Sequence, residues 1–259
     1  MGVDVAIIHP VPNDSIGVDG RVRLLKTRRQ VESILAMMKQ KGDERPPSAI
    51  SITKTIVRPD GQLENVKVTL QQMMDEAAPL DALQRAAGPG AHYEYGFVSY
   101  PVVEAAERWL MSLLPENLSS PAGNVLTSCM RDFGHDGGQV TKMRAAGDRF
   151  FQRREPLRRH WRTANGEWAL TSDQALQLLI GLGPLNPSHV MMVAFVFGLM
   201  PHTLEPQQLQ PAVKDLALRR KFLVHAPLSS PPPEAHELAA MMEMLRNAAA
   251  YDATLWIDA

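Results

Sequence analysis

The sequence has almost no cysteine and no apolar run long enough to cross a membrane. Cys129 is the single cysteine in 259 residues, which excludes an intrachain disulfide and disfavours a thiolate-rich zinc site. The longest apolar stretch, residues 190–200, falls short of the roughly 20 residues that a membrane-spanning helix needs. The first residues also lack the basic region and apolar core of a signal peptide. We therefore expect a reducing, cytoplasmic location and no transmembrane segment.

Motifs for the common catalytic chemistries are also missing from the sequence. It contains no phosphate loop, dinucleotide-binding, nucleophile-elbow, zinc-protease or calcium-loop pattern. His135 and Asp136 could form an acid-base pair or bind a metal, but Gly137 and Gly138 follow them and favour a tight turn. We therefore predict no catalytic residue, no metal site and no cofactor. An active site assembled from residues far apart in the chain would leave no such local pattern.

Positive charge is concentrated in two segments, although the formal net charge of the whole chain is −1. Residues 131–162 contain nine basic and four acidic residues, and residues 21–41 contain seven basic residues and one acidic residue. Phe150, Phe151, His160 and Trp161 lie among the arginines of the first segment. Because guanidinium groups bind phosphate and rings stack on bases, this mixture favours a polyanion with bases as the partner. A solvated helical face is the competing interpretation of each segment.

Hydrophobic periodicity predicts helices over most of the chain. Two β-branched runs, residues 50–57 and 63–70, flank a Pro59-Asp60-Gly61 turn and predict one β-hairpin. Residues 189–200 offer almost no polar side chains, so we predict a buried core helix there. The predicted helices span residues 21–41, 71–87, 101–114, 121–133, 140–162 with a break at Pro156, 174–182, 189–200, 211–224 and 234–251.

The two ends of the chain are predicted to be arms. Residues 3–8 form a short strand or extended arm before Pro10 and Pro12, and the Pro-rich residues 226–233 precede an amphipathic helix. We therefore predict a mainly α fold with one β-hairpin and minor α+β character, as a two-lobed helical body with an extended N-terminal arm and a C-terminal helical arm. The predicted domains are residues 1–20 (N-terminal arm), 21–134 (N-terminal lobe with the hairpin), 135–225 (C-terminal helical lobe) and 226–259 (Pro-rich spacer and C-terminal helix).

The order of these elements resembles that of the nucleoproteins of segmented negative-strand RNA viruses of the bunyavirus type. The similar segments are the hairpin ISITKTIVRPDGQLENVKVTL, the helix VVEAAERWLMSLL, and the helices SDQALQLLIGLG and HVMMVAFVFGLM. The resemblance implies that RNA lies in a basic groove of a helical body and that the arms link neighbouring copies. The resemblance also implies that the protein is present in the virus particle as well as in the cytoplasm.

We therefore predict sequence-nonspecific binding of single-stranded RNA, coupled to self-association through the N- and C-terminal arms, in a nucleoprotein or coat-like protein that is not an enzyme. One alternative is a matrix-like scaffold that binds an acidic partner or an anionic membrane surface. Another is an enzyme that acts on a phosphorylated substrate, with His135 or His160 as the base. The residues predicted to contact nucleic acid are Arg23, Lys26, Arg28, Arg29, Lys142, Arg144, Arg149, Phe151, Arg153, Arg154, Arg158, Arg159, Trp161 and Arg162.

Overall fold

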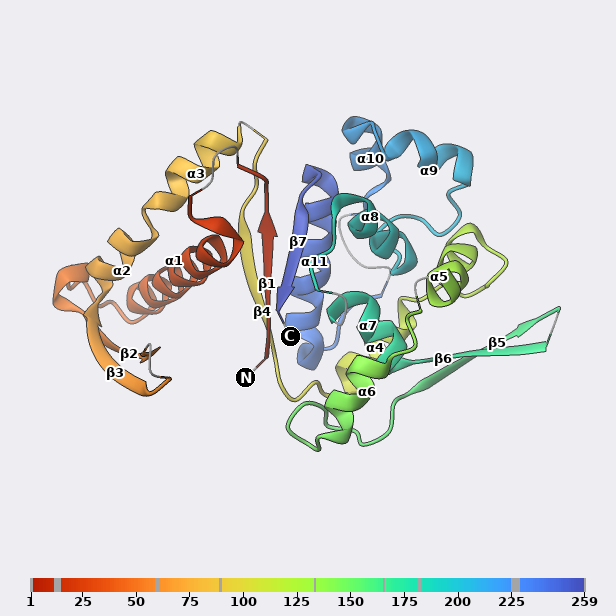
Figure 1. The fold of residues 1–259 in the computed structure, drawn as a ribbon, viewed down its shortest axis with the longest axis horizontal. Helices are drawn as coiled ribbons and strands as arrows, with labels where there is room; N and C mark the ends of the chain where they lie inside the picture. The colour runs from red at the N-terminus through yellow and green to blue at the C-terminus, as the bar shows by residue number, and fades with distance from the viewer. Residues whose placement is uncertain are drawn as a thin grey trace. The chain divides into compact units, whose positions relative to one another are not determined.

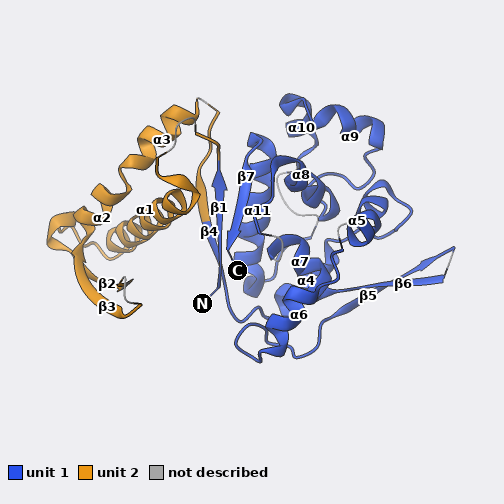
Figure 2. Ribbon diagram, viewed as in Figure 1, with its two compact units in different colours: residues 1–8, 96–259 blue, residues 9–95 orange. Residues whose placement is uncertain are grey.

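The chain forms two compact units, which are coloured separately in Figure 2. A computed structural model describes residues 2–11, 15–58, 61–88, 90–132, 134–164, 166–180, 183–224 and 229–258. Unit 1 consists of Met1–Ile8 and Gly96–Ala259, and unit 2 consists of His9–Tyr95. This division differs from the predicted one, whose boundaries fell after residues 20, 134 and 225, because the N-terminal strand belongs with the C-terminal part of the chain.

Unit 2 is built around one long helix that packs against a shorter one. The side chains between these helices and the neighbouring hairpin form a small core, with Val31, Leu70 and Met73 buried. Thr69 begins the shorter helix with a capping box, in which its hydroxyl accepts from the Gln72 amide and the Gln72 side chain accepts from the Thr69 amide. The elements are α1 (Gly17–Gln40), the short 3-10 helix η1 (Pro47–Ala49), β2 (Ser51–Val57), β3 (Leu63–Thr69), α2 (Leu70–Ala77) and α3 (Pro79–Ala87).

The predicted β-hairpin is confirmed. Strands β2 and β3 pair antiparallel, from Ser51 opposite Thr69 to Val57 opposite Leu63. Two residues of the predicted turn, Pro59 and Asp60, lie outside the described residues. Since side chains alternate between the faces of a strand, one face of this hairpin packs on the unit 2 core and the other is exposed to solvent.

Unit 1 contains a three-stranded sheet with the strand order β4-β1-β7 and a large helical part. Strand β1 pairs antiparallel with β7, from Asp4 opposite Asp258 to Ile8 opposite Thr254. The elements, shown in Figure 1, are β1 (Gly2–Ile8), β4 (Glu94–Ser99, which begins at the end of unit 2), α4 (Glu104–Ser112), α5 (Pro121–Asp132), α6 (Gly138–Ala145), β5 (Arg158–Thr163), β6 (Gly166–Thr171), α7 (Ser172–Ile180), α8 (Pro187–Val196), α9 (Pro206–Ala212), α10 (Leu216–Phe222), η2 (Pro233–Ala235), α11 (His236–Tyr251) and β7 (Thr254–Asp258).

The N-terminal segment is a core strand, so the prediction of an extended N-terminal arm is wrong. Val3, Val5 and Ile7 have no exposed surface, and Ile8 is also buried. Residues 5–8 of this run are apolar at consecutive positions, which is typical of a strand that is covered on both faces. Ala6 and Ile8 are buried as well as Val5 and Ile7, so both faces of β1 are covered, and its central place in the β4-β1-β7 sheet pairs both of its edges.

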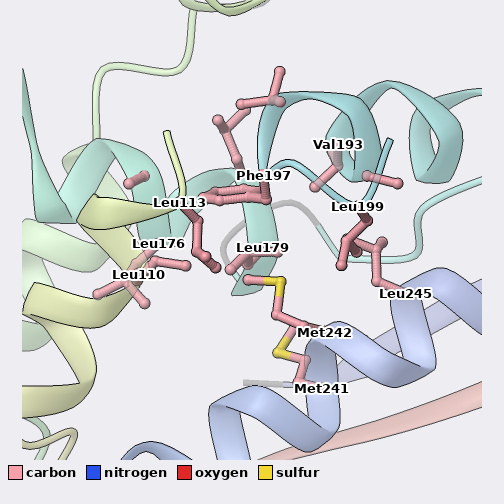
Figure 3. Packing of buried hydrophobic residues seen from close by; sticks show 14 of the residues in the cluster. Leu110, Leu113, Leu176, Leu179, Val193, Phe197, Leu199, Met241, Met242 and Leu245 are labelled. Carbon is pink, nitrogen blue, oxygen red and sulfur yellow. The ribbon is translucent and has the colours of Figure 1, made fainter. Parts of the chain in front are cut away.

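The C-terminal helix is also part of the unit 1 core, so the prediction of a C-terminal helical arm is wrong. Figure 3 shows Met241, Met242 and Leu245 of α11 packed among side chains of the other helices, and all three are buried. The amphipathic pattern of this segment identified its apolar side correctly but does not distinguish packing on the same chain from packing on another copy. The chain then returns to the sheet as β7.

The strongly apolar segment after residue 186 is a core helix, as predicted. Asn186 caps α8 by accepting a hydrogen bond from the His189 amide, and Val193 and Val196 of this helix are buried. Phe197 and Leu199, which follow it, pack in the same cluster (Figure 3). Among the described residues, no helix combines the length and apolar character needed to cross a bilayer.

The fold is a mixture of α and β structure, and the prediction of a mainly α fold with one hairpin is wrong. Helix accounts for 52% and strand for 19% of the structure, and the strands form three small sheets. The main error concerns residues 158–163, which we predicted as the end of a helix and which form strand β5. Arginines occupy positions 158, 159 and 162 on both faces of this strand, and they hide the period-two pattern.

Candidate nucleic-acid interface

Three arginines of the central basic segment lie on a second hairpin of unit 1, formed by β5 and β6. Figure 1 shows these strands extending beyond the helices α4, α6 and α7. The strands pair from Arg158 opposite Thr171 to Thr163 opposite Gly166. Because side chains alternate, Arg158, His160 and Arg162 share one face of β5, which we call the outer face.

The opposite, inner face of this hairpin is held against the end of α4. The Arg159 Nη1 atom donates hydrogen bonds to the carbonyl oxygens of Met111 at 2.7 Å and Leu114 at 2.9 Å. The Trp161 indole donates to the carbonyl oxygen of Pro115 at 2.9 Å. Carbonyls at a helix C-terminus lack helical partners and attract cations, so these contacts fix the inner face there. Burial lowers the pKa of Arg159, and nearby Glu116 offsets part of this effect.

The base of the hairpin is tied to a buried ionic network. Ser172 follows β6, and its amide donates to the carbonyl oxygen of Leu157 at 2.9 Å. The Ser172 hydroxyl donates to Glu107 Oε2 at 2.6 Å. Arg144 Nη2 donates to the same Glu107 oxygen at 2.6 Å and to Asp173 Oδ1 at 2.7 Å. Together these bonds join α4, α6, α7 and the start of the hairpin.

The outer face carries two exposed arginines and one acidic residue, Glu167, which lies opposite Arg162 in the strand register. Arg158 and Arg162 are exposed, and within the described part of the chain neither side chain forms an ion pair or hydrogen bond. His160 lies between them, and its Nδ1 atom is 3.0 Å from Glu167 Oε1. Positions two apart on a strand are separated by roughly 6.4–6.8 Å. On β5 the outer face is therefore a basic stripe with an arginine at each end and, in the middle, a histidine that contacts Glu167.

The loop that leads into β5 adds further exposed bases. Arg149 in this loop and Lys142 on α6 are exposed, and in the described residues they have no ionic partner. Arg154 Nε lies 3.7 Å from Asp148 Oδ1, and both side chains are largely exposed, so this pair contributes little. Arg153 differs, because its Nη1 atom is 3.0 Å from Glu104 Oε2.

Three of the residues predicted to contact nucleic acid lie inside unit 1. Arg144 is 4% exposed, Phe151 is 1% exposed and Trp161 is 6% exposed. The Arg144 guanidinium lies over the Phe151 ring at 4.1 Å from its centroid, so this contact between cation and ring is internal. Neither aromatic ring is available to stack on a base. The outer face therefore offers cations and a histidine but no large aromatic platform.

The predicted residues of the other basic segment lie on α1, in unit 2. Arg23 and Arg29 are exposed, and Arg29 Nη1 is 3.8 Å from Glu32 Oε2. Arg28 Nη2 is 2.6 Å from Asp81 Oδ1, and Lys26 is partly buried with an interaction of its own. These side chains form a basic helix surface of unit 2, whereas the β5–β6 interface is built from unit 1 alone.

The residue that our sequence prediction left out of the interface is His160. The signal that would have included it is the alternation of Arg158, His160 and Arg162 on one side of a strand. Among the described residues, no group of three or more histidine, cysteine, aspartate or glutamate side chains is placed to hold a metal ion. The chain matches no protein-family model, and no curated protein or solved structure is similar to it.

Proposed function

We propose that this chain binds single-stranded RNA without sequence preference through the outer face of the β5–β6 hairpin. The observation that supports this most is the exposure of Arg158 and Arg162 on one strand face, where neither forms an ion pair within the described residues, while the inner face is fixed by Arg159 and Trp161. Arg149 and Arg154 extend the same positive region along the chain. A preorganised row of guanidinium groups favours phosphate oxygens, because each group can donate two parallel hydrogen bonds.

We expect no sequence preference because, within the described residues, the outer face has no exposed aromatic ring that could stack on a base. Base identity is recognised by hydrogen bonds to base edges, and ribonucleoprotein modules add stacked aromatic rings. The two rings that we predicted for stacking are buried, so phosphate contacts would supply most of the affinity. A flexible single strand can follow the basic stripe, and the resemblance in element order to viral nucleoproteins favours RNA as the nucleic acid.

The same observation favours one alternative, which is an anionic surface without bases. A matrix-like protein would place Arg158 and Arg162 against lipid head groups, and each basic residue near such a surface contributes about 1 kcal/mol. Flotation with vesicles that contain phosphatidylserine, with and without competing RNA, distinguishes the two functions. Vesicle binding that RNA cannot displace would support the alternative.

The direct test is a salt series with a labelled single-stranded RNA, read by fluorescence anisotropy. The variant Arg158→Gln/Arg162→Gln removes two phosphate contacts, so we expect the slope of log affinity against log salt to fall by about 1.4. The matched control is Lys214→Gln/Lys221→Gln, which removes the same charge from exposed positions of unit 1 outside the hairpin. Equal changes in the two double variants would refute the interface, and wild-type binding that ignores salt would refute the function. A DNA strand of the same sequence tests the preference for RNA.

A further inference from the structure

The β2–β3 hairpin of unit 2 leaves one strand edge unpaired. In the described part of the chain, the only strand beside β2 is β3. The Leu70 amide donates to the Ile50 carbonyl at 2.9 Å, and the Arg58 amide donates to the Gln62 carbonyl at 2.8 Å. Because hydrogen-bonded pairs alternate along an antiparallel ladder, the main chain of Ile52, Lys54 and Ile56 faces β3. The main-chain groups of the odd-numbered residues 51–57 therefore point away from β3.

This edge has few of the features that usually prevent strands from pairing. The seven residues of β2 pair one for one with β3, with no bulge, and the strand contains no proline. Its one charged residue is Lys54, whose ammonium lies 3.2 Å from Glu76 Oε2 on α2. Native edge strands are normally protected by prolines, bulges or charges, and an edge without them is a template for another strand.

We infer that the edge of β2 is a self-association surface, at which β2 of a second copy adds in antiparallel orientation. The evidence for a second copy as the occupant is the segment Ile52-Thr53-Lys54-Thr55-Ile56, which reads the same in both directions. A two-fold interface requires that residue i meets residue j and residue j meets residue i. Any antiparallel pairing about a two-fold axis meets this requirement, and what the palindrome adds is that a pairing centred on Lys54 places Thr53 opposite Thr55 and Ile52 opposite Ile56 of the second copy, which are favourable cross-strand pairs.

The hydrogen-bonding pattern fits this register. With the two-fold axis at Lys54, Thr53 lies opposite Thr55 of the second copy, and both direct their main-chain groups toward the partner. Together with the pairs formed by residues 51 and 57, the two strands exchange about eight main-chain hydrogen bonds. Ile56, which is 36% exposed, lies opposite Ile52 of the second copy and becomes covered. The product is a four-stranded sheet, which is more stable than two isolated hairpins.

The two Lys54 side chains meet at the axis, and this is the unfavourable part of the register. Like charges directly opposite one another destabilise a strand pair. Each Lys54 already has its own Glu76, so the axis holds two ion pairs and no net charge. This surface would supply the self-association that the sequence led us to expect from the two arms, which the fold buries, and it does not depend on RNA binding.

The test is the mass of nuclease-treated protein in sedimentation equilibrium across a dilution series, without RNA. We expect a concentration-dependent rise above the 28.7 kDa of one chain. Thr53→Pro removes an outward amide and leaves the β2–β3 ladder intact, since proline is tolerated on edge strands at such positions. We expect the dissociation constant of the dimer to rise at least about tenfold in this variant. The substitution disrupts the hydrogen-bonded pair that residue 53 forms with Thr55 of the second copy, and this pair occurs on each side of the axis. The matched control Thr53→Val keeps the amide and should associate like the wild type.

A second variant tests the register and does not depend on the folding of the proline variant. Strand residues opposite each other in a non-hydrogen-bonded pair have Cα atoms about 4.5 Å apart, which suits a disulfide. Lys54→Cys should therefore form a covalent dimer on oxidation, whereas Thr53→Cys should not, and the wild type controls for the buried Cys129. A wild type that stays at 28.7 kDa up to its solubility limit would overturn the inference. Equal association of Thr53→Pro and Thr53→Val, or a Lys54→Cys dimer that does not cross-link, would also overturn it.

Discussion

Replacing Arg144 should lower the free energy of unfolding of unit 1, because this side chain is the centre of the buried network at the base of the β5–β6 hairpin. The side chain donates to Asp173 Oδ1 from Nε at 2.8 Å and from Nη2 at 2.7 Å, and to the carbonyl oxygen of Arg153 at 2.8 Å. It also binds both oxygens of Glu107, which has no exposed surface. Burial lowers the pKa of Arg144, but its hydrogen bonds to Glu107 and Asp173 outweigh this and raise the pKa overall. The guanidinium is therefore charged in the folded chain.

The expected magnitude follows from what Arg144→Met leaves behind. Glu107 is 0% exposed and Asp173 is 1% exposed, so two carboxylates would lose their cation in the interior. Removing one partner of a buried ion pair costs about 3–5 kcal/mol, against a total unfolding free energy of about 5–15 kcal/mol for a typical protein. With a urea dependence of about 1–3 kcal/mol per molar, the unfolding midpoint should fall by at least about 1 M.

The assay is urea unfolding of Arg144→Met, followed by circular dichroism and by tryptophan fluorescence. Arg149→Gln is the matched control, because it removes an exposed arginine of the same basic segment and should change the midpoint little. Adding Glu107→Gln to Arg144→Met removes one uncompensated carboxylate and should restore part of the stability. A loss below about 0.5 kcal/mol for Arg144→Met would refute the view that this network holds α4, α6 and α7 together.

Two further predictions concern groups that burial keeps uncharged. Burial lowers the pKa of His202 and, with nearby His189, that of His135. The unfolded chain therefore binds more protons below about pH 6.5, so stability should fall as the pH drops below that value, and His202→Gln should reduce this slope in thermal melts from pH 7 to pH 5. Burial raises the pKa of Cys129 to about 11 from 9.0, so its thiol should react with a disulfide reagent at least about a hundredfold more slowly in the native protein than in urea. Equal labelling rates would contradict the burial of this thiol.

The elements that the sequence predicted well are those with complete local signals. The first hairpin has a Pro-Asp-Gly turn between two β-branched runs, and α8 has a cap at Asn186 before an uninterrupted apolar run. Neither depends on what lies beside it in the fold. The strand β1 and the helix α11 have equally clear apolar patterns. Such a pattern predicts that an apolar face is buried, but it does not identify the segment that buries it. Whether the same chain or another copy covers it is decided by pairing partners far away in sequence, such as β7 for β1.

The candidate interface was predictable as a region but not residue by residue. Arg144, Arg153, Arg158 and Arg159 look alike in the sequence, yet one is buried, one is ion-paired, one is exposed and one is bound to helix carbonyls. The sorting depends on Glu107 and Glu104, which lie on α4, and on the end of that helix. No pattern within residues 131–162 contains this information, because the partners are supplied by tertiary structure.

Because some arginines of the basic segment are buried or ion-paired, not all of its bases can bind phosphate. Of its bases, Arg144 and Arg159 are used internally, while Arg131 and Arg153 lie beside Asp132 and Glu104 at 2.6 Å and 3.0 Å. Five of the nine bases of the segment therefore remain for phosphate, namely Lys142, Arg149, Arg154, Arg158 and Arg162. Since each phosphate contact adds only about 0.7 to the salt slope of a single-strand complex, one chain should bind RNA weakly. Linking chains raises the effective concentration of the second site, so weak contacts become tight only in an array. An interface of this size is therefore consistent with a protein that acts through several copies on one strand, and it makes the self-association surface as important to the proposed function as the arginines themselves.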